Sequence, residues 1–356
     1  MKVALLLMIS AASAAATGFD VYSDSGRIHR IEGASGREVA VNYRRSDDGG
    51  KTWTAPVRVD GGRPAYHFSA GDARVIAEGD AVYALWARPG KGPHGSGPLA
   101  MARSTDGGMT WAAAGSPSEG SPFGRRFPAL AINQGVVHAV WLDREKKSKV
   151  LASFSSDGAR TWSKPATLDP DACECCWNSA FAGKDGAVYA LYRGRNPRDM
   201  DAVVSRDGGI TWSTPAVAGP FGWGFNGCPH VGGALASTGA GVSALVWTGK
   251  DEQAGLYAFP SPDGTTWGRS VKLGGPGAKH ADLTASGSLF AAVWDDGGKI
   301  WGSVSGDGKS WSNPSRLSDE NHHASYPRVA AAGKGFRVFW TEKDRIADAT
   351  LSGDKK

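Results

Sequence analysis

The sequence predicts an all-β chain folded as a β-propeller of four-stranded blades, and three observations support this. A variant of the motif S-x-D-x-G-x-T-W occurs six times, and successive motif tryptophans lie 44 to 58 residues apart, which is typical of a repeat architecture. Hairpins with period-two apolar character recur between the motifs, as strands require. The 356 residues include 50 Gly and 14 Trp and are 41% hydrophobic, which fits a loop-rich all-β chain with a large core.

The repeated motif predicts a tight turn between two strands. Its Asp accepts hydrogen bonds from nearby backbone N–H groups, its Gly adopts a left-handed conformation, and its Trp packs the turn onto the strands. Two copies are one residue shorter, and Ala159 replaces the second Gly of the third copy, a drift that a structural turn tolerates. The copies occupy residues 46–53, 104–111, 155–162, 205–212, 261–267 and 305–311.

Each unit is predicted to hold four short strands. One strand precedes the motif, a second follows it, and a separate hairpin ends in an aromatic residue, namely Trp86, Trp141, Tyr192, Trp247, Trp294 or Trp340. Six units with the motif are followed by one without it, from Ser325 to about Leu351, so the unit count favours seven blades over six. We expect an N-terminal strand to complete the last blade, because that would remove an exposed sheet edge.

The chain ends and its charge bear on localisation and partners. Residues 1–16 resemble a secretory signal peptide, with Lys2, an apolar run over 3–9 and small residues over 12–16. We therefore expect a periplasmic or secreted protein with no membrane span, one propeller domain over 17–352 and a disordered tail over 353–356. The net charge of +5 comes from basic residues scattered among acidic ones, so no nucleic-acid partner is expected.

The loops that lead into the innermost strands predict a ligand pocket at one end of the channel. They carry Trp177 and His280 among other polar and aromatic residues, including His67, Asp72 and Arg126. Aligning the units on the aromatic that ends the second strand places Arg74, Ala129, Ala180, Asp282 and Arg328 at equivalent positions. Two arginines near the axis predict an anion site, because guanidinium groups match carboxylate or phosphate. The alternative is an internal Arg–Asp pair within a polar channel.

The loop after the second strand of the middle unit adds Arg193, Arg195 and Arg198. By strand order this loop opens toward the same face as the predicted pocket. We therefore include Arg193 and Arg198 among the predicted ligand-binding residues.

The motifs resemble those of Asp-box (BNR) repeat propellers of the sialidase superfamily, over nearly all of the predicted mature chain. That resemblance implies an active site with three arginines on a carboxylate, a Tyr–Glu nucleophile pair and an Asp acid/base. Tyr326 lies roughly where the family places its nucleophile, and Arg193 or Arg195 can match one arginine. The family's other parts are missing: residues 27–29 lack the expected proline, 178–186 hold no Glu, and 249–257 hold no Arg. The resemblance thus supports the propeller fold more strongly than it supports sialidase activity.

The four cysteines are the most distinctive local feature. Cys173, Cys175 and Cys176 lie in one loop and Cys228 lies in the corresponding loop of the next unit, two residues before His230. This pairing also resembles that of uncharacterised bacterial secreted Asp-box proteins. One interpretation is disulfides, with three possible connectivities, of which one link would be short-range or vicinal. The other is a thiolate site for copper or zinc with His230 as an added ligand. A mixed or redox-active state is a third.

Three functions follow from these features. The first is a non-catalytic propeller that binds an anionic small molecule, a glycan or a protein partner. The second is a metal-binding or redox protein that uses the cysteine cluster. The third is an exo-sialidase-type glycoside hydrolase, with Tyr326 as its weakly supported catalytic candidate.

Overall fold

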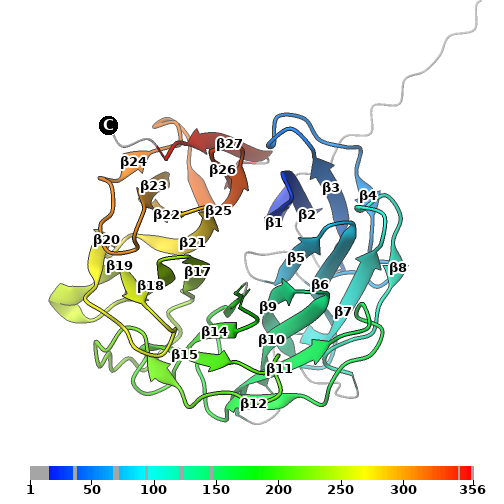
Figure 1. The fold of residues 1–356 in the computed structure, drawn as a ribbon, viewed down its shortest axis with the longest axis horizontal. Helices are drawn as coiled ribbons and strands as arrows, with labels where there is room; N and C mark the ends of the chain where they lie inside the picture. The colour runs from blue at the N-terminus through cyan, green and yellow to red at the C-terminus, as the bar shows by residue number, and fades with distance from the viewer. Residues whose placement is uncertain are drawn as a thin grey trace, which may run out of the picture.

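A computed structural model of the chain shows seven β-sheets arranged as blades around a central channel (Figure 1). It describes residues 16–34, 38–66, 72–92, 95–119, 124–144, 147–183, 185–343 and 345–353. Within these residues, six blades have four strands and the last has three, and neighbouring strands of each blade are antiparallel. The prediction of a β-propeller, and the preference for seven blades, are confirmed.

Within each of the first four blades, the strands lie side by side in the order of the sequence, and the first strand is nearest the axis. They are β1 (Ala16–Asp24), β2 (Arg27–Ala34), β3 (Asn42–Ser46) and β4 (Val57–Arg58); β5 (Ala73–Glu78), β6 (Ala81–Pro89), β7 (Ser96–Ser104) and β8 (Ala112–Ala113); β9 (Arg125–Asn133), β10 (Val136–Arg144), β11 (Ser148–Ser155) and β12 (Ala166–Asp169); β13 (Ser179–Ala182), β14 (Val188–Arg193), β15 (Met200–Ser205) and β16 (Ala216–Val217).

The last three blades repeat this order. They comprise β17 (Ala234–Thr238), β18 (Gly241–Thr248), β19 (Gly255–Ser261) and β20 (Val271–Gly274); β21 (Lys279–Ser286), β22 (Leu289–Asp296), β23 (Lys299–Ser305) and β24 (Ser315–Arg316); β25 (Ala324–Ala332), β26 (Gly335–Glu342) and β27 (Arg345–Leu351). A single 3-10 turn, η2 (Asp251–Gln253), precedes β19.

The hydrophobic core is divided into layers between adjacent blades. In β10 of the third blade, for example, Ala139 and Trp141 face the second blade, whereas Val140 and Leu142 face the fourth. Successive side chains of a strand point to opposite faces of the sheet, so a strand buried on both faces reads as a continuous apolar run. This is why the second strands, such as 81–87 and 136–142, are apolar almost throughout.

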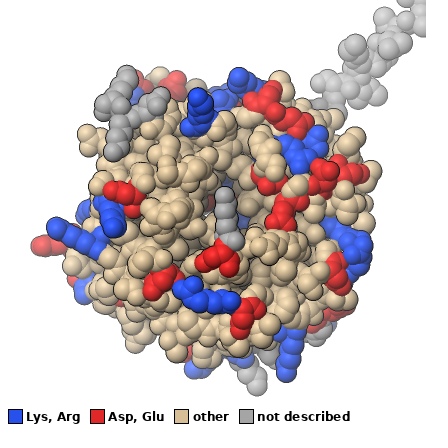
Figure 2. All heavy atoms as spheres, viewed as in Figure 1, with Lys and Arg blue, Asp and Glu red and all other residues tan. Residues whose placement is uncertain are grey.

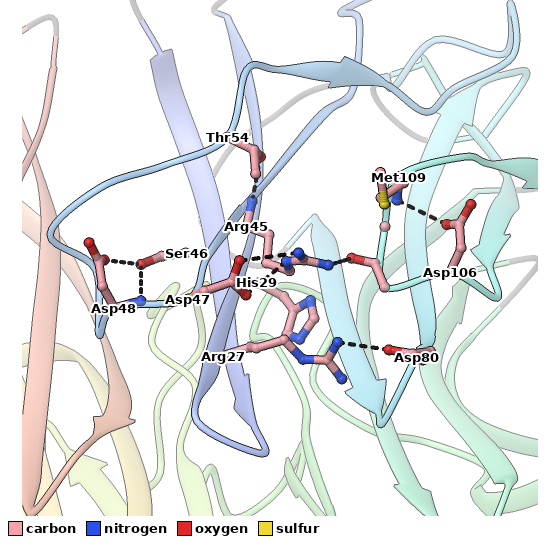
Figure 3. Close-up of polar contacts among 12 residues, drawn as sticks. Arg27, His29, Arg45, Ser46, Asp47, Asp48, Thr54, Asp80, Asp106 and Met109 are labelled. Atoms are coloured by element: carbon pink, nitrogen blue, oxygen red, sulfur yellow. Dashed lines mark hydrogen bonds and ion pairs between the residues drawn. The ribbon is translucent and has the colours of Figure 1, made fainter.

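The Asp-box turns have the predicted geometry, and Figure 3 shows the contact between Ser46 and Asp48 of the first copy. The Ser46 hydroxyl donates to Asp48 over 2.8 Å and accepts the Gly50 N–H over 2.8 Å. The Asp48 carboxylate accepts the backbone N–H groups of Lys51 and Thr52, at 3.0 and 2.9 Å. The carboxylate thus supplies the acceptors that a tight turn otherwise lacks.

Each box turn also packs against the preceding blade. A Cβ at Gly108 of the second box would lie 2.1 Å from the Tyr43 ring of the first blade, and one at Gly264 would lie 2.5 Å from Tyr189. Gly50 of the first box meets Phe339 of the last blade in the same way, at 3.0 Å. The glycines are therefore needed for close packing between blades as well as for their positive φ angles.

Within the described residues, no N-terminal strand completes the last blade, contrary to expectation. β1 is the innermost strand of the first blade and pairs with β2 through a turn at Ser25 and Gly26. Pairing within a local hairpin closes a much shorter loop than pairing with the distant C-terminal blade, and so costs less chain entropy. The last blade has three strands in the described part of the chain.

In the part of the chain that the structure describes, side-chain contacts rather than a shared blade join the two ends of the ring. Trp53 of the first box contacts Phe339 edge to face, with ring centroids 5.7 Å apart. Phe19 of β1 belongs to the same apolar layer as Ala330 and Phe339 of the last blade. The closure is therefore a packing interface between first and last blade, like that between any other two.

The predicted signal peptide lies outside the described residues apart from Ala16, as do residues 354–356 of the predicted tail. In the part of the chain that the structure describes, no helix has the length and apolarity needed to cross a bilayer. On the face shown in Figure 2, basic and acidic side chains are interspersed around a central hollow.

Candidate functional site

The structure brings together the predicted axial positions. Arg74, Ala129, Ala180, Asp282 and Arg328 all line one cavity of about 1100 Å³ in the central channel. Two further residues complete this ring, Asp20 of β1 and Leu235 of β17. Each lies near the start of an innermost strand or within it, so the strand order of the propeller itself places the seven side chains around the axis.

Asp20 links the two predicted arginines. Its Oδ1 lies 3.2 Å from Nε of Arg328 and 3.7 Å from Nη1 of Arg74, while its Oδ2 accepts the N–H of Val75 over 3.0 Å. In blade order the charges alternate as Asp282, Arg328, Asp20 and Arg74. The alternation keeps two buried arginines compensated, because an unpaired buried charge is strongly unfavourable.

Sequence reasoning missed Asp20 for a specific reason. Asp20 lies 12 residues before Glu32, the same spacing that separates Arg74 from Trp86. The second strand of the first blade carries no aromatic residue at that point, so an alignment on the aromatic skipped this blade. The spacing alone, applied to every unit, is the signal that finds Asp20.

The ring is also tied to the backbone. Oδ2 of Asp282 accepts the N–H of Val329 in the next blade over 2.9 Å. Burial raises the pKa of the Asp282 carboxyl, and the positive charge of Arg328 opposes that rise. Burial lowers the pKa of Arg74, and Asp20 opposes that change. The internal Arg–Asp pair is thus present, and anion binding by the same arginines stays a prediction.

Three aromatic rings form an arc that meets this cavity at Trp177. Trp177 lines the cavity and its ring centroid lies 5.6 Å from that of His280, which in turn lies 4.1 Å from that of Tyr326. These residues come from the fourth, sixth and seventh blades. Trp177 reaches the sixth blade by passing over Gly232 of the fifth, where a Cβ would lie only 2.2 Å from the indole.

Backbone irregularities aim two of these rings. His280 and Tyr326 have φ angles of 50° and 55°, and each lies where the pairing of its innermost strand shifts register. Such bulges redirect side chains and are common beside functional sites. Asp295 holds both residues: its Oδ2 lies 2.7 Å from Nδ1 of His280 and accepts the Tyr326 N–H over 2.8 Å.

Tyr326 is the most exposed member of the arc, at 37%. Burial of its ring, with a further contribution from the Asp295 charge, raises the pKa of its phenol. The sequence did not single out Asp295, the residue that orients the arc. Only the antiparallel pairing of β21 with β22 brings this carboxylate opposite the bulge.

Arg193 and Arg198 are placed differently from the prediction. Arg193 is 2% exposed and donates to the carbonyl oxygens of Val231 and Trp247, at 3.1 and 2.9 Å. Arg198 donates to the carbonyl of Phe225 and, over 2.8 Å, to Sγ of Cys173. Both hold the cysteine loops in place, and neither lines the channel cavity that the described residues form. A ligand contact from either stays a prediction.

Arg195 also faces the cysteine loop. Its guanidinium pairs with Asp171 at 2.6 Å and with Glu174 at 3.3 Å. The two arginines that the sialidase resemblance offered, Arg193 and Arg195, are therefore engaged away from Tyr326. Among the other predicted loop residues, Arg126 pairs with Asp72 at 3.1 Å, and His67 lies outside the described residues.

The cysteine loops face each other as the sequence suggested. The Sγ atom of Cys173 lies 3.7 Å from that of Cys175 and 3.5 Å from that of Cys176, and all three residues are buried thiols. Cys175 Sγ also lies within 4.8 Å of ligand atoms of Cys228 and His230 on the neighbouring loop. Glu174, inside the cysteine motif, lies 3.7 Å from Cys228 Sγ.

The thiols of this cluster differ in acidity. Hydrogen bonds from the Cys175 and Cys176 thiols lower the pKa of the Cys173 thiol, and the nearby Arg198 adds to that effect. Burial raises the pKa of the Cys176 thiol. Crowding the thiols beside a cation thus moves the pKa values of Cys173 and Cys176 in opposite directions.

Comparison with known proteins gives the family and the fold. The family described as "BNR repeat-like domain" matches residues 32–339. No curated protein matches the sequence.

Solved structures resemble the chain at low sequence identity. The BP39L lectin from Burkholderia pseudomallei superposes with a TM-score of 0.69 at 14% identity, covering 96% of this chain and 98% of the lectin. A PL25 ulvan lyase bound to -[GlcA(1-4)Rha3S]- gives 0.62 at 13%, covering 93% and 91%. The K499G mutant of the NanB sialidase from Streptococcus pneumoniae gives 0.51 at 12%, covering 95% and 68%. These similarities show a shared fold.

Proposed function

This chain belongs to the family of BNR repeat-like domains, and on that premise we propose that it binds an anionic carbohydrate at the mouth of its channel without cleaving it. The observation that carries this proposal is the aromatic arc beside two axial arginines. Tyr326 lies two residues before Arg328 on β25, and Trp177 lines the same cavity as Arg74 and Arg328.

The chemistry of the mouth suits such a ligand. Sugar rings present apolar faces that pack on aromatic side chains, and binding sites commonly combine such rings with a few placed polar groups. A guanidinium has five N–H donors. The contacts made by the described residues use Nε and Nη1 of Arg328 and Nη1 of Arg74, so within that part of the chain the Nη2 donors of both can serve a carboxylate or sulfate.

The structural neighbours support the carbohydrate class. BP39L is a lectin, and the ulvan lyase structure holds -[GlcA(1-4)Rha3S]-. Proteins with this fold thus include a lectin and a polysaccharide lyase, and the fold leaves the choice of glycan to the residues at the site.

The test is a glycan array of uronate-, sialate- and sulfate-bearing oligosaccharides with their neutral counterparts, followed by calorimetry on the best ligand. We expect binding to an acidic class at least tenfold tighter than to its neutral counterpart. Tyr326→Ala and Arg74→Gln should each weaken binding at least tenfold, as loss of a charge-assisted or stacking contact does. Ile210→Ala, at an exposed residue of an Asp-box turn, is the matched control and should bind normally. The proposal is overturned if both variants bind as tightly as the unmodified protein. It is also overturned if the folded protein binds no acidic ligand.

Absence of cleavage is tested separately. A fluorogenic sialoside should remain intact across about pH 4 to 8, the range in which carboxyl and imidazole catalysts work. Cleavage by the protein that Tyr326→Phe abolishes would instead support the sialidase-type alternative.

A further inference from the structure

The cysteine cluster contains two sets of three ligand atoms that share one sulfur. The inner set is Cys173, Cys175 and Cys176, and all three are buried. The outer set is Cys175, Cys228 and His230, in which the last two are exposed. Two adjacent loops therefore supply five potential ligands, and Cys175 belongs to both sets.

The sulfur separations have the size that a shared metal ion requires. An ion with metal–sulfur bonds of about 2.3 Å holds two sulfurs about 3.8 Å apart in tetrahedral geometry and about 4.0 Å apart in trigonal geometry. The observed separations are 3.7 and 3.5 Å. A disulfide needs sulfurs about 2.05 Å apart, so the inner thiols are spaced for a common ion rather than for a bond between any two of them.

The surroundings can neutralise thiolates. Nη1 of Arg198 lies 2.8 Å from Sγ of Cys173, and the charge of Arg193 acts on Cys176. Three thiolates around a monovalent ion carry a net charge of about −2, which two buried guanidinium groups offset. Hydrogen bonds to backbone carbonyls hold both guanidinium groups in place, so the two positive charges are already beside the thiols before an ion binds.

We infer that the inner set, Cys173, Cys175 and Cys176, binds one copper(I) ion, and that Cys228 and His230 form its exposed approach route. Soft thiolate ligands select copper(I), zinc and iron–sulfur clusters. Three sulfurs complete the coordination of copper(I), whereas structural zinc requires four closed ligands. His230, with a φ of 53°, holds its ring beside Cys228 at the surface, where an incoming ion would first meet nitrogen and sulfur.

The test uses the full chain, reduced and free of metal under anaerobic conditions. Copper(I) is titrated against the chelator bicinchoninate, and zinc is titrated in parallel. We expect one copper(I) ion to be withdrawn from the chelator per chain. Cys176→Ser should weaken that ion at least 100-fold, since a ligand itself is lost. His230→Ala should slow copper uptake with at most a tenfold loss of affinity. His323→Ala, an exposed histidine of another loop, is the matched control and should behave as the unmodified protein.

A second measurement covers the case in which Cys176→Ser does not fold. In the unmodified protein, bound copper(I) should slow alkylation of the three inner thiols by iodoacetamide at least tenfold relative to the metal-free protein. Unchanged alkylation, no withdrawal of copper from the chelator, or zinc bound in preference to copper would each overturn the inference. So would disulfides that survive mild reduction. None of these outcomes depends on the carbohydrate site, which uses other residues.

Discussion

Nε of Arg328 in the last blade lies 3.2 Å from Oδ1 of Asp20 in the first blade, and the two residues are 308 positions apart in sequence. This buried ion pair spans the point at which the propeller ring closes. Close by, Oγ of Ser23 accepts the N–H of Ala331 over 2.9 Å. Polar contacts of inner-strand residues thus supplement the apolar layer around Phe339 at a junction where the described residues form no shared blade.

The first prediction concerns this pair. Arg328→Met removes the nearer guanidinium partner of the buried Asp20 carboxylate and leaves it with Arg74 at 3.7 Å, so it should reduce the free energy of unfolding by about 3 kcal/mol. Replacing both residues, as D20L/R328M, should cost less than the sum of the two single changes, because neither member of this pair is then left without the other. Urea denaturation measures both. Arg316→Met, which breaks an exposed pair with Glu320, is the control and should change stability by less than about 0.5 kcal/mol. An Arg328→Met protein as stable as the control would show that the pair does not hold the ring.

The second prediction concerns the serine that begins each Asp-box. In the third box, the buried Ser155 hydroxyl accepts the Ala159 N–H over 2.9 Å. Ser155→Ala leaves that buried N–H without an acceptor and should destabilise the protein by about 1–3 kcal/mol. Ser156→Ala changes the neighbouring exposed serine and should be neutral. Thermal unfolding of the two variants side by side provides the measurement, and similar midpoints would contradict a role for the buried hydroxyl.

The third prediction concerns acid sensitivity. Burial lowers the pKa of His138 to about 4, and burial together with the charge of Arg27 lowers that of His29 to about 4. An unfolded histidine has a pKa of about 6.5, so the unfolded state binds more protons between these values. The stabilisation is complete above about pH 6.5 and is lost as pH falls toward about 4, by about 3 kcal/mol per histidine.

Urea midpoints between pH 7 and pH 4 test this dependence. His138→Gln should flatten the pH profile in that window, because one buried titrating group is removed. His323→Gln, at an exposed histidine, should keep the original slope. A profile that stays steep in the His138 variant would assign the acid sensitivity to other groups.

The fourth prediction concerns the thiols. Cys228 is exposed, whereas Cys173, Cys175 and Cys176 are 1%, 5% and 2% exposed. In the native, metal-free and reduced protein, a thiol reagent should therefore label one cysteine rapidly and three slowly. Four should react after denaturation. An intact mass four units below that of the reduced chain, with no reactive thiol, would establish two disulfides instead.

Features that depend on contacts between residues close in the sequence could be predicted, whereas features that depend on contacts between distant residues could not. The Asp-box turn is local: Ser46, Asp48 and Gly50 satisfy one another within five residues, so the repeat was visible in the sequence and fixed the fold. Arg74 and Arg328 were placed on the axis by a constant spacing within each unit, and the cavity confirms that placement. Asp20 was missed because its blade lacks the aromatic residue used for alignment.

The contacts of Arg193 and Arg198 could not be predicted from the sequence. Their loop was assigned to the correct part of the structure, but a guanidinium can donate to a ligand, a carbonyl or a thiolate with equal ease. The partners of Arg193 lie on β18 and on the loop before β17, and those of Arg198 on two different loops. No pattern within one unit records which of these acceptors is nearest.

The sequence by itself determined the repeating turn, the alternation of the strands, the preference for seven blades and the convergence of the two cysteine loops. These depend on contacts within a unit, or on the same contact made between every pair of neighbouring units. Only the tertiary structure decided how the ring closes, what the axial arginines contact and which carboxylate orients His280 and Tyr326. Those features depend on single contacts between distant segments, where burial forces each charge and each hydrogen-bonding group to find one particular partner.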